Sequence, residues 1–388
     1  MQLSKRMERF GDEIFAALNE KKIEMEAKGK KTYNLFVGTP DFPVSEHIRQ
    51  ALIESAKDPE SWKYTLRDIP ELLEAVCSYY KRRYGVEIRP EQVSSCYGSE
   101  EGVGLIGLAL CDEGDTVILP TPCYPVFMAG ANMAGADAYY YKMNEENNFL
   151  PNVKEIPEEV AKKARYMIVS LPSNPTGSVG NEENYLEIIE FAKKYDVLII
   201  HDNAYSDIIF EGGPGRSFLS WPGAMDVGVE FFSLSKSFNM TGARVSFCIG
   251  RKDIVDAFKK LRSQIDFGMF LPIQKAAIAA LSGPQDALSR QCGGYKERRD
   301  ALCEGLRSIG WPVNDSKGSM FVWAKIPEGY GSSMDFCMEL MERSGVICTP
   351  GSSFGAAGEG YVRFALTLPA EEIKEAVKAI ERSGIIRN

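Results

Sequence analysis

The segment 232–244, Phe-Ser-Leu-Ser-Lys-Ser-Phe-Asn-Met-Thr-Gly-Ala-Arg, places a lysine where an apolar strand meets a serine-rich loop. Lysine is rarely buried, and removal from water lowers the pKa of its amine, so that Lys236 can attack a carbonyl carbon and form a Schiff base. Arg244, eight residues later, can bind a phosphate through two hydrogen bonds, and Ser233 can add a hydroxyl. A lone lysine would equally suit a strand end from which it reaches solvent.

Three further polar residues come before this lysine, each beside an apolar run. Asn174 follows one run, Asp202 ends the next, and Tyr205 comes three residues after Asp202. We expect them at the carboxyl ends of parallel strands, where open α/β sheets bind ligands. Singly, Asn174 would suit a turn and Asp202 a helix cap, but together with Lys236 they predict one binding site.

The elements that must position these residues alternate along the chain. Helical stretches are expected at 70–84, 100–111 and 182–195, between β-branched or apolar runs. Those runs cover residues 116–120, 165–172, 197–202 and 229–235. Because they are apolar throughout rather than alternating, they indicate parallel strands covered on both faces.

Near residue 285 the pattern changes to long helices with a few strands, among them 320–326 and 361–366. We therefore predict a large α/β domain over residues 44–284 and a small α+β domain built from 1–43 and 285–388. The cleft between two such domains is a usual place for a small-molecule site.

Composition and charge narrow the classes of function. With 26% charged residues, 44% apolar residues and a formal charge of −9, the 388-residue chain suits a globular protein with little attraction for nucleic acid or an acidic membrane surface. No apolar run is long enough to span a membrane, and the first residues lack the apolar core of a signal peptide. The nine cysteines form no Cys-x-x-Cys pair, as in a reduced cytoplasmic protein, and His47 and His201 have no partner at metal-ligand spacing. No metal site is therefore expected.

One glycine motif offers a rival interpretation. Gly102-Val-Gly104-Leu-Ile-Gly107 has the G-x-G-x-x-G spacing of dinucleotide-binding loops. Residues 116–136 contain no acidic residue to bind a ribose, and the glycines lie inside an apolar run. We therefore expect a helix that packs closely on its neighbours rather than a nicotinamide site.

With these motifs in place, the chain resembles the fold-type I pyridoxal-phosphate aminotransferases of class I/II, and most of all their LL-diaminopimelate aminotransferase branch. The resemblance runs nearly end to end, through GTPDFP, YKRRYGVEI, YGSEEG, PTPCYPVF, LPSNPTG, HDNAYSDI, FSLSKSFNMTGAR, TPGSSFG and YVRFALT. It implies a large domain with a mostly parallel seven-stranded sheet, a pyridoxal 5′-phosphate cofactor, and a cytoplasmic homodimer with shared active sites. It also implies ping-pong transfer of an amino group from an L-amino acid to a 2-oxo acid.

The resemblance assigns roles around the cofactor ring. Lys236 forms the Schiff base with the cofactor and then moves the proton that the substrate Cα loses. Asp202 faces the pyridine nitrogen and keeps it protonated. Asn174 and Tyr205 bind the phenolic oxygen, and Tyr124 stacks on the ring. Without the resemblance, Tyr124 would suit a core aromatic residue.

For the phosphate group, the resemblance implies a cup at the start of a helix, where Ser99 and Glu100 offer free backbone N–H groups. Ser233 and Arg244 complete this cup. Tyr64 reaches the phosphate of a neighbouring subunit, although by itself it would suit a strand edge.

For the substrate, the resemblance implies that Arg363 binds the α-carboxylate through two hydrogen bonds beside Asn174, and that Gly38 lets the backbone approach it. The diaminopimelate branch usually has lysine in place of Glu100. The charge near the far end of the substrate is thus reversed, which argues against a long dicarboxylic substrate. Arg67, in an apparently shortened loop, is a candidate for a distal carboxylate across the dimer interface, or an ordinary solvated arginine.

Two other functions remain open at this point. A β-lyase acting on cystathionine-like substrates would use the same cofactor residues and release ammonia and pyruvate. A non-catalytic cofactor-binding regulator would need neither Lys236 nor Arg363, and no basic helix-turn-helix segment precedes the first helix.

Overall fold

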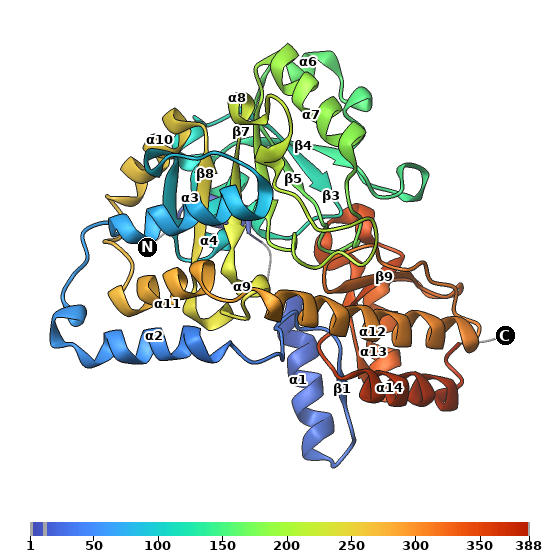
Figure 1. Ribbon diagram of the computed structural model, residues 1–388. Coiled ribbons are helices and arrows are strands. Elements are labelled where there is room, and N and C mark those ends of the chain that lie inside the picture. Colours follow the sequence, from blue (N-terminus) through green and yellow to red (C-terminus); the bar gives the residue numbers. More distant parts are fainter. Residues whose placement is uncertain (1–2, 11–13, 387–388) are drawn as a thin grey trace.

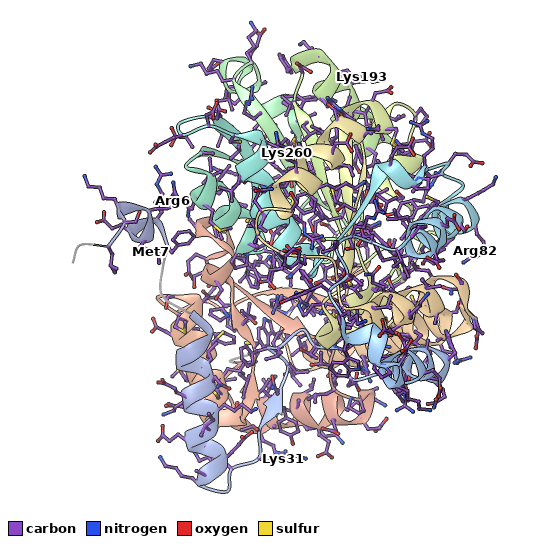
Figure 2. The ribbon with its side chains drawn as sticks, turned by 90° about the vertical axis from the view of Figure 1, so that its left-hand side faces the viewer. Arg6, Met7, Lys31, Arg82, Lys193 and Lys260 are labelled. Atoms are coloured by element: carbon purple, nitrogen blue, oxygen red, sulfur yellow. The ribbon has the colours of Figure 1, made fainter. Side chains whose placement is uncertain are left out.

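The computed structural model describes residues 3–10 and 14–386. Figure 1 shows a sheet covered by helices and a smaller part in which the first helix lies beside the last ones. In Figure 2, the exposed side chains of Lys31 and Lys193 lie near the bottom and the top of the view, and that of Lys260 projects over the middle of the molecule.

Seven strands form the central sheet, in the order β2-β8-β7-β6-β5-β3-β4. They are β2 (Val93–Cys96), β3 (Thr116–Thr121), β4 (Asp137–Lys142), β5 (Ala164–Ser170), β6 (Leu198–Asn203), β7 (Gly228–Ser233) and β8 (Ser246–Gly250). The neighbours from β4 to β7 run parallel, whereas β8 runs antiparallel to both β2 and β7. Every residue of β6 and β7 is buried, as expected for strands covered on both faces. The predicted, mostly parallel seven-stranded sheet is confirmed.

Helices cover both faces of this sheet. One face carries α4 (Ser99–Leu110), α5 (Val126–Ala134) and α10 (Lys252–Arg262). The other carries α2 (Glu46–Lys57), α3 (Pro70–Tyr84), α7 (Glu182–Tyr195), α8 (Ala224–Val227) and α11 (Leu271–Ser282). Successive strand residues enter opposite cores, because side chains alternate along a strand: Ile200 and Phe231 join the first core, and Ile199 and Phe232 the second.

The glycine motif lies inside α4, where Gly102, Gly104 and Gly107 are buried. A Cβ atom at Gly102 would lie 2.3 Å from the ring of Phe231, and one at Gly107 would lie 3.3 Å from Ala134. The glycines therefore allow α4 to pack closely on β7 and α5, as the sequence predicts, and they form no dinucleotide loop.

The smaller part joins the two ends of the chain. Its elements are α1 (Ile14–Ala27), β1 (Tyr33–Asn34), α12 (Asp286–Ser308), β9 (Phe321–Lys325), α13 (Ser333–Ser344), β10 (Val346–Ile347), β11 (Thr349–Pro350), β12 (Tyr361–Ala365) and α14 (Ala370–Ser383). β1 pairs in parallel with β10, and β11, β12 and β9 form an antiparallel sheet. A third core, which includes Leu35 and Trp311, holds these elements together. The domain boundaries at residues 44 and 285 stay a prediction.

The remaining helices are short. α6 (Glu158–Ala161) precedes β5, and α9 (Leu234–Ser237) follows β7. Short 3-10 helices cover Lys5–Arg9, Pro59–Trp62, Pro90–Gln92, Glu145–Asn147, Val153–Glu155, Phe218–Ser220, Thr241–Ala243, Gly351–Phe354 and Ala356–Gly358. Within the described part of the chain, no helix is both long and apolar enough to cross a membrane.

Candidate active site

A cavity of about 540 Å³ lies between the central sheet and the three-stranded sheet. Its walls come from the carboxyl-terminal side of β5, β6 and β7, the start of α4, residues 36–39, β9 and β12. It brings together the following predicted site residues: Gly38, Ser99, Glu100, Tyr124, Asn174, Asp202, Tyr205, Ser233, Lys236, Arg244 and Arg363. Among residues 3–10 and 14–386, no group of three or more His, Cys, Asp or Glu side chains is placed to hold a metal ion.

Lys236 lies on α9, immediately after β7. Ser233 caps this short helix, because its hydroxyl oxygen accepts a backbone N–H from the first turn at 3.2 Å. The Nζ atom of Lys236 donates to the carbonyl oxygen of Gly38 at 2.6 Å. Burial, reinforced by the positive charges of Arg363 and Arg244, lowers the pKa of Lys236 from 10.5 to about 8. Part of the amine is therefore neutral near physiological pH, as a nucleophile must be.

Asp202 lies near the end of β6 and is 8% exposed. Its Oδ1 atom is buried and has no hydrogen-bond partner. Burial raises the pKa of Asp202 from 3.8 to about 6. A buried carboxylate oxygen without a donor is costly, and a protonated ring nitrogen would supply the missing donor. At this point the site fits pyridoxal phosphate.

The start of α4 forms a cup for an anion. Gly98, the residue before the helix, has a φ of 92°, and a Cβ atom there would lie 2.3 Å from Nη2 of Arg244, so the position requires glycine. Arg244 directs Nη2 toward the helix start, 3.7 Å from the carboxylate of Glu100. Ser99 and Glu100 begin the helix, where backbone N–H groups have no partner within it. This arrangement fits the phosphate of the cofactor.

Asn174, Tyr205 and Tyr124 surround the remaining space. Asn174 and Tyr205 are buried, and the Tyr124 hydroxyl donates to the Glu100 carboxylate at 3.0 Å. Burial raises the pKa of both tyrosines, so each keeps its proton and can act as a donor. Donors of this kind suit a phenolic oxygen, and an aromatic wall suits a planar ring.

Arg363 enters the cavity from β12 and is 4% exposed. Its Nη1 donates to Oδ1 of Asn174 at 2.8 Å, and its Nη2 to the Phe36 carbonyl oxygen at 2.9 Å. The guanidinium carbon lies 4.2 Å from the ring centre of Phe321 and 4.7 Å from that of Phe354. Burial lowers the pKa of Arg363 to about 10, so the group stays charged at neutral pH, and its buried Nε has no partner. A buried cation with a free N–H fits a substrate carboxylate.

The sequence does not predict the two aromatic rings that contact Arg363, those of Phe321 and Phe354. Phe321 lies in the predicted strand 320–326, and Phe354 lies in the TPGSSFG motif. Neither pattern predicts a contact with Arg363, because that contact depends on the register in which Arg363 of β12 pairs with Trp323 of β9.

Tyr64 and Arg67 lie outside this cavity. Tyr64 is 81% exposed, and its ring centre lies 5.0 Å from that of Phe267. Arg67 is exposed and borders a separate hollow together with Asp266 and Phe267. Their contribution to the site of a neighbouring subunit stays a prediction.

Comparison with known sequences gives matches along nearly the whole chain. A sequence model of the family "Aminotransferase class I and II" matches residues 30–380. The LL-diaminopimelate aminotransferase of Dehalococcoides mccartyi is 41% identical over 379 residues, which cover 97% of each protein. That of Moorella thermoacetica is 40% identical over 384 residues, or 98% of each protein.

Solved structures with this fold are also similar in sequence. Substrate-bound BacF from Bacillus subtilis has a TM-score of 0.94 at 34% identity, with 98% of each chain covered. A probable N-succinyldiaminopimelate aminotransferase from Thermus thermophilus has a TM-score of 0.90 at 32% identity, with 96% of this chain and 100% of that one covered.

Proposed function

Because the chain belongs to the class I and II aminotransferases, we propose that the cavity around Lys236 is its active site. The chain is a pyridoxal-phosphate-dependent aminotransferase, which moves an amino group from an L-amino acid to a 2-oxo acid by a ping-pong mechanism. Neither the family nor these relatives favour the β-lyase or the non-catalytic regulator. One observation carries the assignment of the site: Lys236, Asp202 with an unpartnered oxygen and Arg363 with an unpartnered N–H all line a single cavity.

The residues that would hold the cofactor follow from their chemistry. Asp202 would bind the ring nitrogen, and Asn174 with Tyr205 would bind the phenolic oxygen. Tyr124 would cover one face of the ring. The phosphate would lie in the anion-binding cup, which is formed by Ser99, Glu100, Ser233 and Arg244.

Bound pyridoxal phosphate supplies an electron sink for the charge left when the substrate Cα loses a proton. Lys236 removes that proton with its neutral amine and returns it later in the half-reaction. Arg363 holds the α-carboxylate and so limits the orientations of the Cα–H bond. Asp202 keeps a proton on the ring nitrogen, because a carboxylate beside a ring N–H favours the protonated form.

The far end of the substrate would meet Glu100. Its carboxylate lies in the cavity of its own chain, whereas Arg67 lies outside it. Glu100 therefore favours an amino donor with a distal ammonium group over one with a distal carboxylate alone. LL-Diaminopimelate, which appears in the names of the similar aminotransferases, carries both a distal ammonium group and a distal carboxylate. We therefore propose it as one of the amino donors to be tested.

We also propose that the active unit is a homodimer. Trp62, Tyr64, Leu66, Ile265 and Phe267 are each more than half exposed. They belong to two segments that a β-bridge between Thr65 and Gly268 holds side by side. An exposed apolar surface of this kind favours a protein partner, and a second copy would bring Tyr64 and Arg67 to the neighbouring site.

The proposal also includes a cellular location and two domain boundaries. All nine cysteines are free thiols, which supports a cytoplasmic location. Separate hydrophobic cores support a large domain over 44–284 and a small domain over 1–43 and 285–388, since one core lies mainly in the chain ends and two lie in the middle.

The test is an absorbance titration of the protein loaded with pyridoxal phosphate. L-Glutamate, L-alanine, L-lysine and LL-diaminopimelate would be added in turn, followed by 2-oxoglutarate. We expect the visible band to bleach with at least one amino acid and to return with the 2-oxo acid. A band that persists while pyruvate accumulates would contradict transamination and support the β-lyase.

A further inference from the structure

The lysine loop is held by a side chain that no part of the proposed reaction uses. Gln291 lies near the start of α12, is 5% exposed, and donates from Nε2 to the backbone carbonyl oxygen of Lys236 at 2.6 Å. Its other amide atom, Oε1, accepts a hydrogen bond from Nδ2 of Asn239 at 2.8 Å. Because a carbonyl oxygen can only accept, the nitrogen end of Gln291 must face Lys236, and this fixes the orientation of the amide.

The backbone at Lys236 needs such support. α9 has only four residues, so the Lys236 carbonyl lies at the end of a helix, where no intrahelical partner exists. Three residues later, Asn239 has a φ of 57°, in the left-handed region. Gln291 therefore joins the lysine to the turn that follows it.

A second contact anchors α9 at the next residue. The hydroxyl of Ser237 donates to Oδ2 of Asp207 at 2.6 Å, and Asp207 is itself paired with Arg83 at 2.9 Å. With residue 237 held by its side chain and residue 236 by its carbonyl, the main chain at Lys236 is fixed at two adjacent residues. The four-carbon side chain is then the part left free to move the amine.

Helix α12 also anchors the segment of chain that the Lys236 amine contacts. Arg298, seven residues after Gln291 and hence on the same face of α12, pairs with Asp41 at 2.6 and 2.8 Å. Asp41 lies three residues after Gly38, whose carbonyl accepts the Nζ hydrogen bond of Lys236. One face of α12 thus holds both the backbone of Lys236 and the segment against which its amine lies.

We propose that Gln291 is a positioning residue for Lys236: its amide fixes the main chain from which the amine must reach both the cofactor and the substrate Cα. This inference rests on the proposed role of Lys236. Misplacement of a reacting group by about 1 Å can cost on the order of 100-fold in rate, so a loosened anchor should slow proton transfer without preventing binding.

The test compares two isosteric substitutions, one within α12 and one at the residue before it. Gln291→Glu keeps the acceptor toward Asn239 but places a second oxygen against the Lys236 carbonyl, where no donor remains. The matched control is Gln285→Glu, at the residue before α12, where the amide donates to the carbonyls of Ala280 and Gly283 at 2.9 and 2.8 Å and touches no part of the lysine loop.

The first measurement is a single turnover of the loaded enzyme with the donor that bleaches the wild-type band, carrying hydrogen or deuterium at Cα. For Gln291→Glu we expect a single-turnover rate about 10- to 100-fold lower, a larger deuterium isotope effect and, in separate steady-state assays, a KM within about twofold of wild type. Gln285→Glu should match wild type in all three. A slower turnover with an unchanged isotope effect, or equal losses in both variants, would overturn the proposal.

A second measurement does not depend on turnover. Amide hydrogen exchange of residues 234–243 in the loaded protein should be faster in Gln291→Glu than in wild type or Gln285→Glu. Unchanged exchange in Gln291→Glu would contradict the anchoring role of Gln291. Failure of every amino acid to bleach the wild-type band would instead refute the proposed function. The exchange measurement therefore tests the anchoring role independently of turnover. If Gln291→Glu does not fold, Asn239→Asp replaces it, because the new carboxylate should turn the Gln291 amide away from Lys236, with the same expected results.

Discussion

Two sets among the predicted ligands of cofactor and substrate have opposite surroundings. Asn174, Asp202 and Arg363 are more than nine-tenths buried, and their strands and loops belong to one chain. Tyr64 is 81% exposed and Arg67 lies beside a separate hollow. The buried group is therefore assembled by the fold itself, whereas the exposed group can act only through another molecule. A single chain can therefore supply the buried residues of the site by itself, whereas Tyr64 and Arg67 can contribute only when a second chain is present.

The largest effect should come from the centre of the buried group. Lys236→Ala removes the amine that moves the Cα proton, so turnover should fall by about 1000-fold or more. Steady-state transamination measures the loss, and thermal unfolding should show a fold like that of wild type. Wild-type turnover in this variant would remove Lys236 from the mechanism.

Asp202→Asn should stabilise the cofactor-free protein while it harms the loaded enzyme. In the native protein the Asp202 carboxyl has a pKa raised from 3.8 to about 6, so it keeps its proton over a range in which the unfolded chain loses it. As the pH rises from 3.8 to about 6, this carboxyl ionises in the unfolded chain but not in the native protein, and the stability of the wild type falls. Above this range the variant should gain about 3 kcal/mol in free energy of unfolding, since one pKa unit corresponds to about 1.4 kcal/mol.

Denaturant titrations of the cofactor-free protein at about pH 7.5 and about pH 4 measure this gain. It should be present at the higher pH and largely absent at the lower one. A variant that is less stable than wild type at both values would mean that hydrogen bonds to Asp202 from Ser99 and Ser170 outweigh the cost of its burial.

Arg363→Lys tests the substrate side of the buried group. Lysine keeps the charge but cannot form the two-pronged contact or offer a planar group to the rings of Phe321 and Phe354. Loss of one charge-assisted hydrogen bond, about 2 kcal/mol, should raise the KM of the amino donor by about 30-fold. A primary amine without a carboxylate serves as the control substrate, and its weak turnover should not change. Equal losses for both amines would point to damage outside the carboxylate contact.

The smallest effect is expected from the exposed group. Arg67→Ala should weaken dicarboxylic donors by about fivefold relative to alanine, because a solvent-exposed charge contributes little. Competition between L-glutamate and L-alanine measures the ratio. A ratio identical to that of wild type would place Arg67 outside the substrate site.

The sequence predicted the larger elements of the fold because burial leaves a pattern. The apolar runs at 116–120 and 165–172 correspond to β3 and β5, and the stretch 182–195 is the helix α7. The two-residue strands β1 and β10 were not predicted, since a strand of two residues has no periodicity to detect. Their pairing depends on contacts between the two ends of the chain.

Within the site, local spacing predicted the polar residues but not what holds them. Asp202 and Lys236 could be placed because one lies near the end of a buried strand and the other follows such a strand, and parallel strands bring their ends to one edge. The bond from Gln291 to the Lys236 carbonyl joins residues 55 positions apart, and no motif includes both. Such contacts depend on how helices pack across the sheet, which single-residue patterns do not encode.

The pairing of β1 with β10 has a consequence for how the protein is made. Tyr33 lies opposite Val346, so the first strand to leave the ribosome finds its partner only when almost the entire chain has been synthesised. The central sheet, by contrast, has all of its strands once Gly250 has emerged. Since segments distant in sequence close last, β1 is among the last elements to pair, and a chain cut short before Val346 would carry all strands of the central sheet but leave β1 without its partner.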